Sequence, residues 1–210
     1  MLGGSGSGKS FFMNHLVRQY WEQGAHIVLV DTGNSYSGLC EMIRRKTHGD
    51  DGVYFTYTEE SPISFNPFFT QDKVFDVEKK ESIKTLLLTL WKKDNEPASR
   101  SEEVALSNAV ALFIDRIKYD DSLVPSFDTF YEFVDTDYRA ILDAKGVRDK
   151  EFDITNFLNV LEPYHKGGEY DFLLNSDKQL DLLDKRFVVF EIDSIKDPPI
   201  LFPVTTIIIM

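Results

Sequence analysis

One stretch near the start of the sequence has residue types and spacing suited to binding phosphate. Glycines in this stretch allow positive φ, so successive backbone N–H groups can converge on phosphate oxygens. A lysine adds positive charge, a serine hydroxyl can bind Mg²⁺, and a helix starting here would point its positive end at the same anion. The stretch fits the pattern G-x-x-x-x-G-K-[ST] at every fixed position, and it consists of Gly3, Gly4, Ser5, Gly6, Ser7, Gly8, Lys9 and Ser10. We therefore predict a P-loop that binds nucleotide phosphates, with Ser10 as the Mg²⁺ ligand.

Other interpretations of this stretch fit the sequence less well. A flexible Gly/Ser linker has no reason to run into Lys9 and Ser10 and then directly into an amphipathic helix. The dinucleotide pattern G-x-G-x-x-G would place a residue other than glycine at a required position. The guanine-binding pattern N-K-x-D is missing from the sequence, so we expect ATP or ADP as the ligand.

Three acidic residues at the ends of predicted strands are further candidates for the site. Glu191 and Asp193 resemble the acidic pair with which P-loop ATPases hold Mg²⁺ through water and activate the attacking water. The alternative is that they form the polar boundary of a buried strand. Asp31 could line the nucleotide crevice at the carboxyl edge of a parallel sheet, and its alternative is a turn or cap acid.

Composition sets limits on the class of protein. The 210 residues are 42% hydrophobic, which is enough for a sizeable core. A formal net charge of -12 argues against direct binding of nucleic acid through a broad basic surface. The single cysteine, Cys40, has no internal disulfide partner, so we expect a buried thiol and a reducing compartment.

The elements needed to position the P-loop follow it in the sequence. Apolar periodicity predicts a helix over 10–23, and 26–31 is typical of a strand buried on both faces of a parallel sheet. A short helix over 35–46 and a strand over 53–57 continue the alternation, and another buried strand is expected over 186–193. This alternation predicts an α/β fold.

Between these strands the pattern is helical for more than a hundred residues. Four helices are predicted: one from about 76 to 93, one capped by Ser101, one from 127 to near Gly146, and one from 154 to Pro163. We therefore assign 1–70 to the first part of a nucleotide-binding core, 71–180 to an all-helical insertion, and 181–210 to the return of the core. Only Met1 and Leu2 precede the P-loop, where a buried strand is expected, so we expect a core that is truncated at both ends.

Four motifs together resemble a known family. They are Gly-Ser-Gly-Lys-Ser-Phe-Phe-Met-Asn-His at 6–15, Val-Leu-Val-Asp-Thr-Gly-Asn-Ser-Tyr at 28–36, Ile-Ser-Phe-Asn-Pro-Phe at 63–68 and Phe-Glu-Ile-Asp-Ser-Ile at 190–195. The chain is similar, over essentially its whole length, to the TraG-type ATPases of Bacteroides conjugative transposons, which are related to the motor ATPases of type IV secretion.

This resemblance implies a RecA-like nucleotide domain in which Gly3 to Ser10 bind ATP phosphates and Mg²⁺. It also implies a hexamer of the full-length protein, with other conjugation-machine subunits as partners, at the cytoplasmic face of the inner membrane. In the family the acidic catalytic pair lies on a later strand, beyond Met210. Catalytic residues are thus not assigned, and we expect this chain to bind ATP but to hydrolyse it poorly.

Two other functions remain open from the sequence. One is a non-catalytic interaction module in which a vestigial P-loop supports a docking surface formed by the helices. The other is a small-molecule P-loop kinase, which would require a complete site in this chain.

Overall fold

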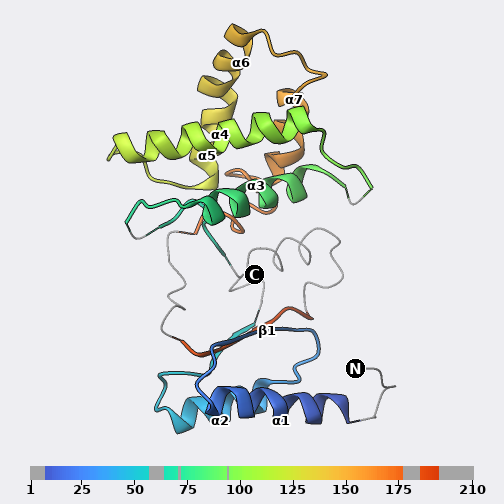
Figure 1. Cartoon of the computed structure of the whole chain (residues 1–210), viewed down its shortest axis with the longest axis vertical. Coiled ribbons are helices and arrows are strands. Elements are labelled where there is room, and N and C mark those ends of the chain that lie inside the picture. The colour runs from blue at the N-terminus through green and yellow to red at the C-terminus, as the bar shows by residue number, and fades with distance from the viewer. Residues whose placement is uncertain (1–7, 57–63, 71, 94, 177–184, 194–210) are drawn as a thin grey trace. The chain divides into compact units, whose positions relative to one another are not determined.

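A three-stranded parallel sheet forms the centre of the first of two compact units (Figure 1). The computed structural model describes residues 8–56, 64–70, 72–93, 95–176 and 185–193. We call residues 1–63 with 180–210 the sheet unit and residues 64–179 the helical unit, and we describe each by itself.

The strands of the sheet unit come from distant parts of the sequence. They are β1 (Ile27–Asp31), β2 (Val53–Thr56) and β3 (Phe187–Glu191), and their order in the sheet is β1-β3-β2. Both neighbours pair with β3 in parallel, so that Val188 has Val28 on one side and Val53 on the other. All five residues of β3 are buried, as predicted for this strand.

Two helices, α1 (Lys9–Glu22) and α2 (Ser37–Lys46), pack on one face of the sheet (Figure 1). Their buried side chains recur at helical spacing, and they meet the inward residues of β3. The resulting core contains Val17, Trp21, Cys40, Ile43, Phe187 and Val189. The predicted buried thiol is confirmed, because Cys40 is 1% exposed and burial raises its pKa to about 11.

The turn into β2 requires a glycine. Gly52 has φ +83°, and a Cβ at this position would lie 2.6 Å from the carbonyl oxygen of Cys40 on α2. A larger residue would therefore be strained and would push α2 away from the sheet.

The prediction that β1 is buried on both faces is wrong. Ile27 and Leu29 face the helices, whereas Val28 and Val30 point to the opposite face and are 56% and 38% exposed. The physical reason is that both described helices of the sheet unit cover the same face. The continuous apolar run of β1 indicates a strand that could be covered on two sides, but it does not say which neighbours cover it.

At the amino edge of the sheet a buried carboxylate joins three elements. Asp51 lies before β2, and its oxygens accept hydrogen bonds from the Arg186 N–H (2.8 Å), the Arg186 guanidinium (3.2 Å) and the Trp21 Nε1–H (3.1 Å). Burial by itself raises the pKa of Asp51, but these donors and the Arg186 charge outweigh it and hold the pKa below its ordinary value. Asp51 thus fastens the start of β3 to α1.

In the described residues of the helical unit the regular elements are all helices. They are α3 (Val77–Trp91), α4 (Arg100–Tyr119), α5 (Phe127–Phe133), a π-helical turn η1 (Val134–Tyr138), α6 (Arg139–Lys145), α7 (Ile154–Leu161) and a 3₁₀ turn η2 (Glu162–Tyr164). The helix predicted over 127–146 is therefore present as α5 and α6, which η1 joins without a gap. It ends at Gly146, which has φ +67°.

The predicted cap of the second helix is wrong by two residues. Ser99, rather than Ser101, is the N-cap of α4: its hydroxyl accepts a hydrogen bond from the Glu102 N–H, and the Glu102 carboxylate accepts one from the Ser99 N–H. This reciprocal capping box satisfies two N–H groups, and Ser101 lacks an acidic or amide residue three positions later to form one.

Three aromatic rings form the centre of the helical unit. Phe68 packs against Phe113 and Phe130 with ring centroids 5.1 and 4.9 Å apart, and Phe113 lies 5.4 Å from Phe130. All three side chains are fully buried. Residues 64–70 thus belong to this unit by their packing. Among the described residues, the helices are too short or too polar to cross a membrane.

We expect Phe113→Ala to destabilise the helical unit by about 3–5 kcal/mol, because it removes a ring from the centre of the core and leaves a cavity. Leu112→Ala is the matched control, since Leu112 is the preceding residue of the same helix and is 37% exposed. Denaturant titration with 5-fluorotryptophan NMR would report the two units separately, through Trp91 and Trp21. Equal losses in the two variants would contradict this assignment of the core.

We also expect Asp51 to make the sheet unit sensitive to acid. Its pKa is lowered in the folded state, so its stabilisation is present above the unfolded pKa of about 4 and is lost as pH falls through the folded pKa. The free-energy difference between wild type and Asp51→Asn should therefore shrink as the pH falls below 4. The exposed neighbour Asp50 provides the control Asp50→Asn. A difference that stays constant with pH would contradict this role.

Candidate nucleotide site

The described part of the predicted P-loop enters the first turn of α1. Gly8 is the N-cap of this helix with φ +77°, and its carbonyl accepts a hydrogen bond from the Phe12 N–H at 2.9 Å. Lys9 and Ser10 are exposed in the first turn. Gly3, Gly4, Ser5, Gly6 and Ser7 lie outside the described residues. The positive φ at Gly8 fits the conformational freedom that the motif demands of its last glycine.

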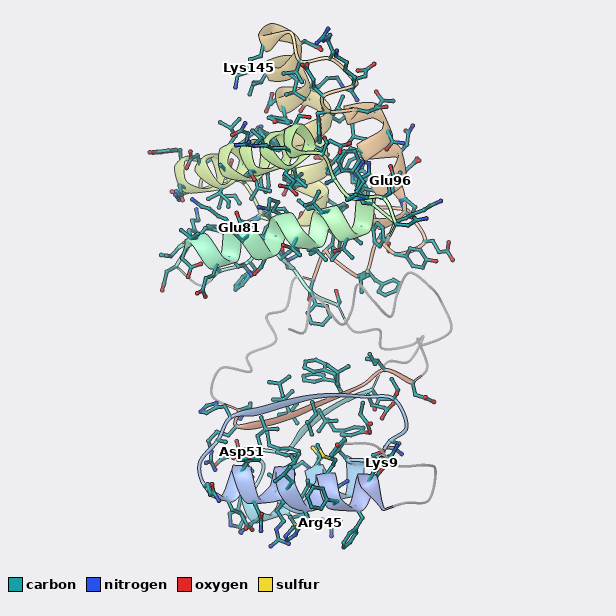
Figure 2. All side chains as sticks on the ribbon, turned by 45° about the vertical axis from the view of Figure 1, so that its right-hand side comes forward. Lys9, Arg45, Asp51, Glu81, Glu96 and Lys145 are labelled. Carbon is teal, nitrogen blue, oxygen red and sulfur yellow. The ribbon has the colours of Figure 1, made fainter. Side chains whose placement is uncertain are left out.

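The N-terminus of α1 lies at the carboxyl edge of the sheet. Figure 2 shows Lys9 at one end of the sheet unit and Asp51, which marks the amino edge, at the other. A hydrogen bond of 2.9 Å from the Asn14 side chain to the Ser35 carbonyl ties α1 to the loop that follows β1. An anion at this end of α1 would therefore lie on the side of the sheet at which β1 and β3 end.

Glu191 is the last residue of β3, and it is almost fully buried. Its carboxylate accepts hydrogen bonds from the backbone N–H groups of Asn34 (2.7 Å), Asp193 (3.0 Å) and Gly33 (3.3 Å). The Tyr54 hydroxyl on β2 lies 3.3 Å from the same carboxylate. Both oxygens are thus engaged in holding the backbone around them.

Asp31, the last residue of β1, is the register partner of Glu191. Its carboxylate accepts a hydrogen bond of 2.6 Å from the Ser35 N–H. Burial raises the pKa of Asp31, the Ser35 N–H opposes this, and the nearby charge of Glu191 raises the pKa further. The structure thus brings together two of the three predicted acids at adjacent strand ends.

The β1–α2 loop, which we define as residues 32–36, is shaped by these carboxylates. Asn34 has φ +54°, a left-handed conformation that asparagine tolerates better than most residues. Its side-chain oxygen accepts a hydrogen bond of 2.6 Å from the Tyr54 hydroxyl. Burial, followed by the charge of Glu191, raises the pKa of Tyr54, so this hydroxyl stays a donor.

Four residues of this edge were missed from the sequence: Asn14, Asn34, Ser35 and Tyr54. Asn14 had one signal, since it stands one helical turn after Ser10 on the face that must meet the sheet. The sequence carries no such signal for Tyr54 and Asn34, because their contact depends on β2 and β1 lying on either side of β3. Asp193 lies two residues past Glu191 and donates its backbone N–H to it.

The chemistry available to this edge is that of a phosphate site. A helix N-terminus and Lys9 attract anions, and the exposed Ser10 hydroxyl is available to a cation bound with them. In the part of the chain that the structure describes, His, Cys, Asp and Glu side chains form no group of three or more that could hold a metal ion.

Comparisons with known proteins agree with this arrangement. The family model described as the TraG P-loop domain matches residues 1–210. Protein TraC of Escherichia coli (strain K12) is 25% identical over 203 residues, which cover 95% of this chain and 21% of TraC. The structure of VirB4 of Thermoanaerobacter pseudethanolicus superposes with a TM-score of 0.58 at 17% identity, over 93% of this chain and 49% of that one.

The likeness to VirB4 shows the fold and confirms the predicted α/β class. The chain spans about a fifth of TraC and about half of the VirB4 chain, so it corresponds to one part of each. The resemblance drawn from the four sequence motifs is confirmed by the family match, which extends over the full length. The chain belongs to the TraG P-loop domain family.

Proposed function

We propose that this chain is the nucleotide-binding part of a motor ATPase of conjugative transfer, of the type IV secretion class. It binds MgATP, and the whole protein couples binding and hydrolysis to transfer of DNA or protein or to assembly of the machine. The observation that carries the proposal is the turn from Gly8 through Lys9 into α1, which opens at the carboxyl edge of a parallel sheet.

The site residues have distinct roles in this proposal. The backbone N–H groups from Gly3 to Gly8 cradle the phosphates, Lys9 neutralises their charge, and the Ser10 hydroxyl binds Mg²⁺. Asp31 lines the crevice beside them at the end of β1. Burial raises the pKa of Asp31 above its ordinary value, and the Ser35 N–H opposes this shift.

We assign Glu191 to holding the site together rather than to activating water. A general base needs a free oxygen within reach of the attacking water, whereas both oxygens of Glu191 accept backbone N–H groups. Asp193 is the remaining acid of the predicted pair. With Glu191 committed in this way, we expect the chain to bind MgATP and to hydrolyse it slowly.

The surroundings of the site in the whole protein follow from the family. We propose a RecA-like core and a hexamer of the full-length protein that works with other conjugation-machine subunits at the cytoplasmic face of the inner membrane. Residues 71–180 form the proposed all-helical insertion in this core, and nearly all of them belong to the helical unit. Direct binding of nucleic acid is not part of the proposal, because the formal net charge is -12.

We expect Lys9→Ala to weaken MgATP binding by about tenfold to a hundredfold, since it removes a charged hydrogen-bond donor to phosphate. The control is Lys46→Ala, which removes the same charge from the last residue of α2. Isothermal titration calorimetry of both variants with MgATP and MgADP measures the effect. If the wild-type protein binds neither nucleotide at millimolar concentration, the interaction module with a vestigial P-loop replaces the ATPase proposal.

We expect Glu191→Gln to destabilise the sheet unit by about 1–3 kcal/mol, because the new amide group would face backbone donors that have lost their acceptor. Glu41→Gln is the control: Glu41 pairs with Arg44 and Arg45 on the exposed surface of α2, so its stability should stay close to that of wild type. The measurement is denaturant unfolding monitored through 5-fluoro-Trp21. Unchanged stability together with loss of ATP turnover would instead identify Glu191 as a catalytic base.

A further inference from the structure

We propose that Asn14 is a positioning residue for MgATP, whose carboxamide couples the phosphate-binding end of α1 to the β1–α2 loop. This proposal rests on the proposed nucleotide-binding function and assigns to it a residue outside the P-loop motif. Asn14 stands one turn after Ser10 on α1 and is partly buried.

Both hydrogens of the Asn14 amide group are in use. Its Nδ2 donates to the Ser10 carbonyl and to the Ser35 carbonyl, each at 2.9 Å. The first bond fixes the backbone of the residue whose hydroxyl would bind Mg²⁺, and the second fixes the loop across from it. A single planar amide group thus sets the distance between the first turn of α1 and the loop. Asparagine is a poor residue for a helix interior, so helix formation does not explain its presence.

The loop that Asn14 holds is connected to the ends of β1 and β3 and to Tyr54 of β2. The Ser35 N–H donates to Asp31 at the end of β1, and the Asn34 N–H donates to Glu191 at the end of β3. The Asn34 side chain accepts the hydroxyl hydrogen of Tyr54 from β2. A displacement of the first turn of α1 would therefore act on this whole network through the Asn14 amide. In such a partly buried network each bond supports the others, so the loss of one is felt by all.

Nucleotide binding acts at the first turn of α1, at Lys9 and Ser10. Phosphate and Mg²⁺ would fix the backbone of Ser10, and its carbonyl is the one that Asn14 already holds. Binding should therefore steady the loop, and by reciprocity a loop held in place should favour binding. Asn14 is the described side chain that bonds to both segments, which makes it the group to test.

The test compares the dissociation constant of ATP, with and without Mg²⁺, in four proteins. Wild type is compared with Asn14→Leu, which keeps the shape but removes the amide, and with Asn14→Gln, which restores an amide. The matched control is Gln19→Met on the same helix, because the Gln19 amide contacts His15 of α1 rather than the loop.

We expect Asn14→Leu to weaken MgATP binding by about tenfold, as is common for residues that orient a ligand-binding group. The tighter binding that Mg²⁺ gives to wild type should be largely lost, because the Ser10 hydroxyl is no longer held in place. Asn14→Gln should recover part of this Mg²⁺ dependence, and Gln19→Met should bind ATP as wild type does. A merely structural role would weaken ATP binding equally with and without Mg²⁺.

Hydrogen exchange gives a second readout that does not depend on catalysis. In wild type, MgADP should slow exchange of the backbone amides of Gly33, Asn34 and Ser35, and in Asn14→Leu this protection should be lost. The inference is overturned if Asn14→Leu keeps both the Mg²⁺ dependence and the protection while Lys9→Ala abolishes binding. If wild type binds no nucleotide, the proposed function fails and this inference fails with it.

Discussion

The pairing of β3 between β1 and β2 is the constraint on which the sheet unit depends. β3 supplies the hydrogen-bond partners of both other strands, and its side chains Phe187 and Val189 complete the core under α1 and α2. β1 and β2 each pair with β3 and not with each other, so without β3 neither would have a partner in the described sheet. The P-loop helix rests on a sheet whose central strand comes from the far end of the chain.

Carboxylates hold both ends of β3 in place, but in different ways. At the amino edge, Asp51 receives a guanidinium and an indole N–H, and its ionised form is favoured. At the carboxyl edge, Glu191 receives backbone N–H groups from the β1–α2 loop, next to a second acid, Asp31, whose ionised form is disfavoured. The contacts of Asp51 hold the start of β3 against α1. Those of Glu191 shape a loop beside the helix end at which phosphate is expected, so stability and binding share the same contacts.

What could be predicted from the sequence was local in origin. The helix that follows the P-loop motif and the strand at 187–191 follow from periodicity, and the buried Cys40 was expected because the sequence has a single cysteine. One wrong assignment concerned a local pattern: the N-cap of α4 is Ser99, whose reciprocal partner Glu102 stands three residues later in the sequence. The other depended on neighbours that a sequence pattern does not identify. The exposure of Val28 depends on which face receives α1 and α2. The roles of Asn14 and Tyr54 arise only when the strand order β1-β3-β2 places them at one edge.

The position of β3 in the sequence has a consequence for synthesis on the ribosome. About 130 residues separate the end of β2 from the start of β3, and at 5–20 residues per second they take roughly 6–26 s to translate. The residues of the helical unit, 64–179, are all translated before those of β3. During that interval β1 and β2 expose apolar, unpaired edges, which are templates for pairing with other chains. The sheet of the nucleotide site therefore cannot be completed until the residues of β3 have been translated.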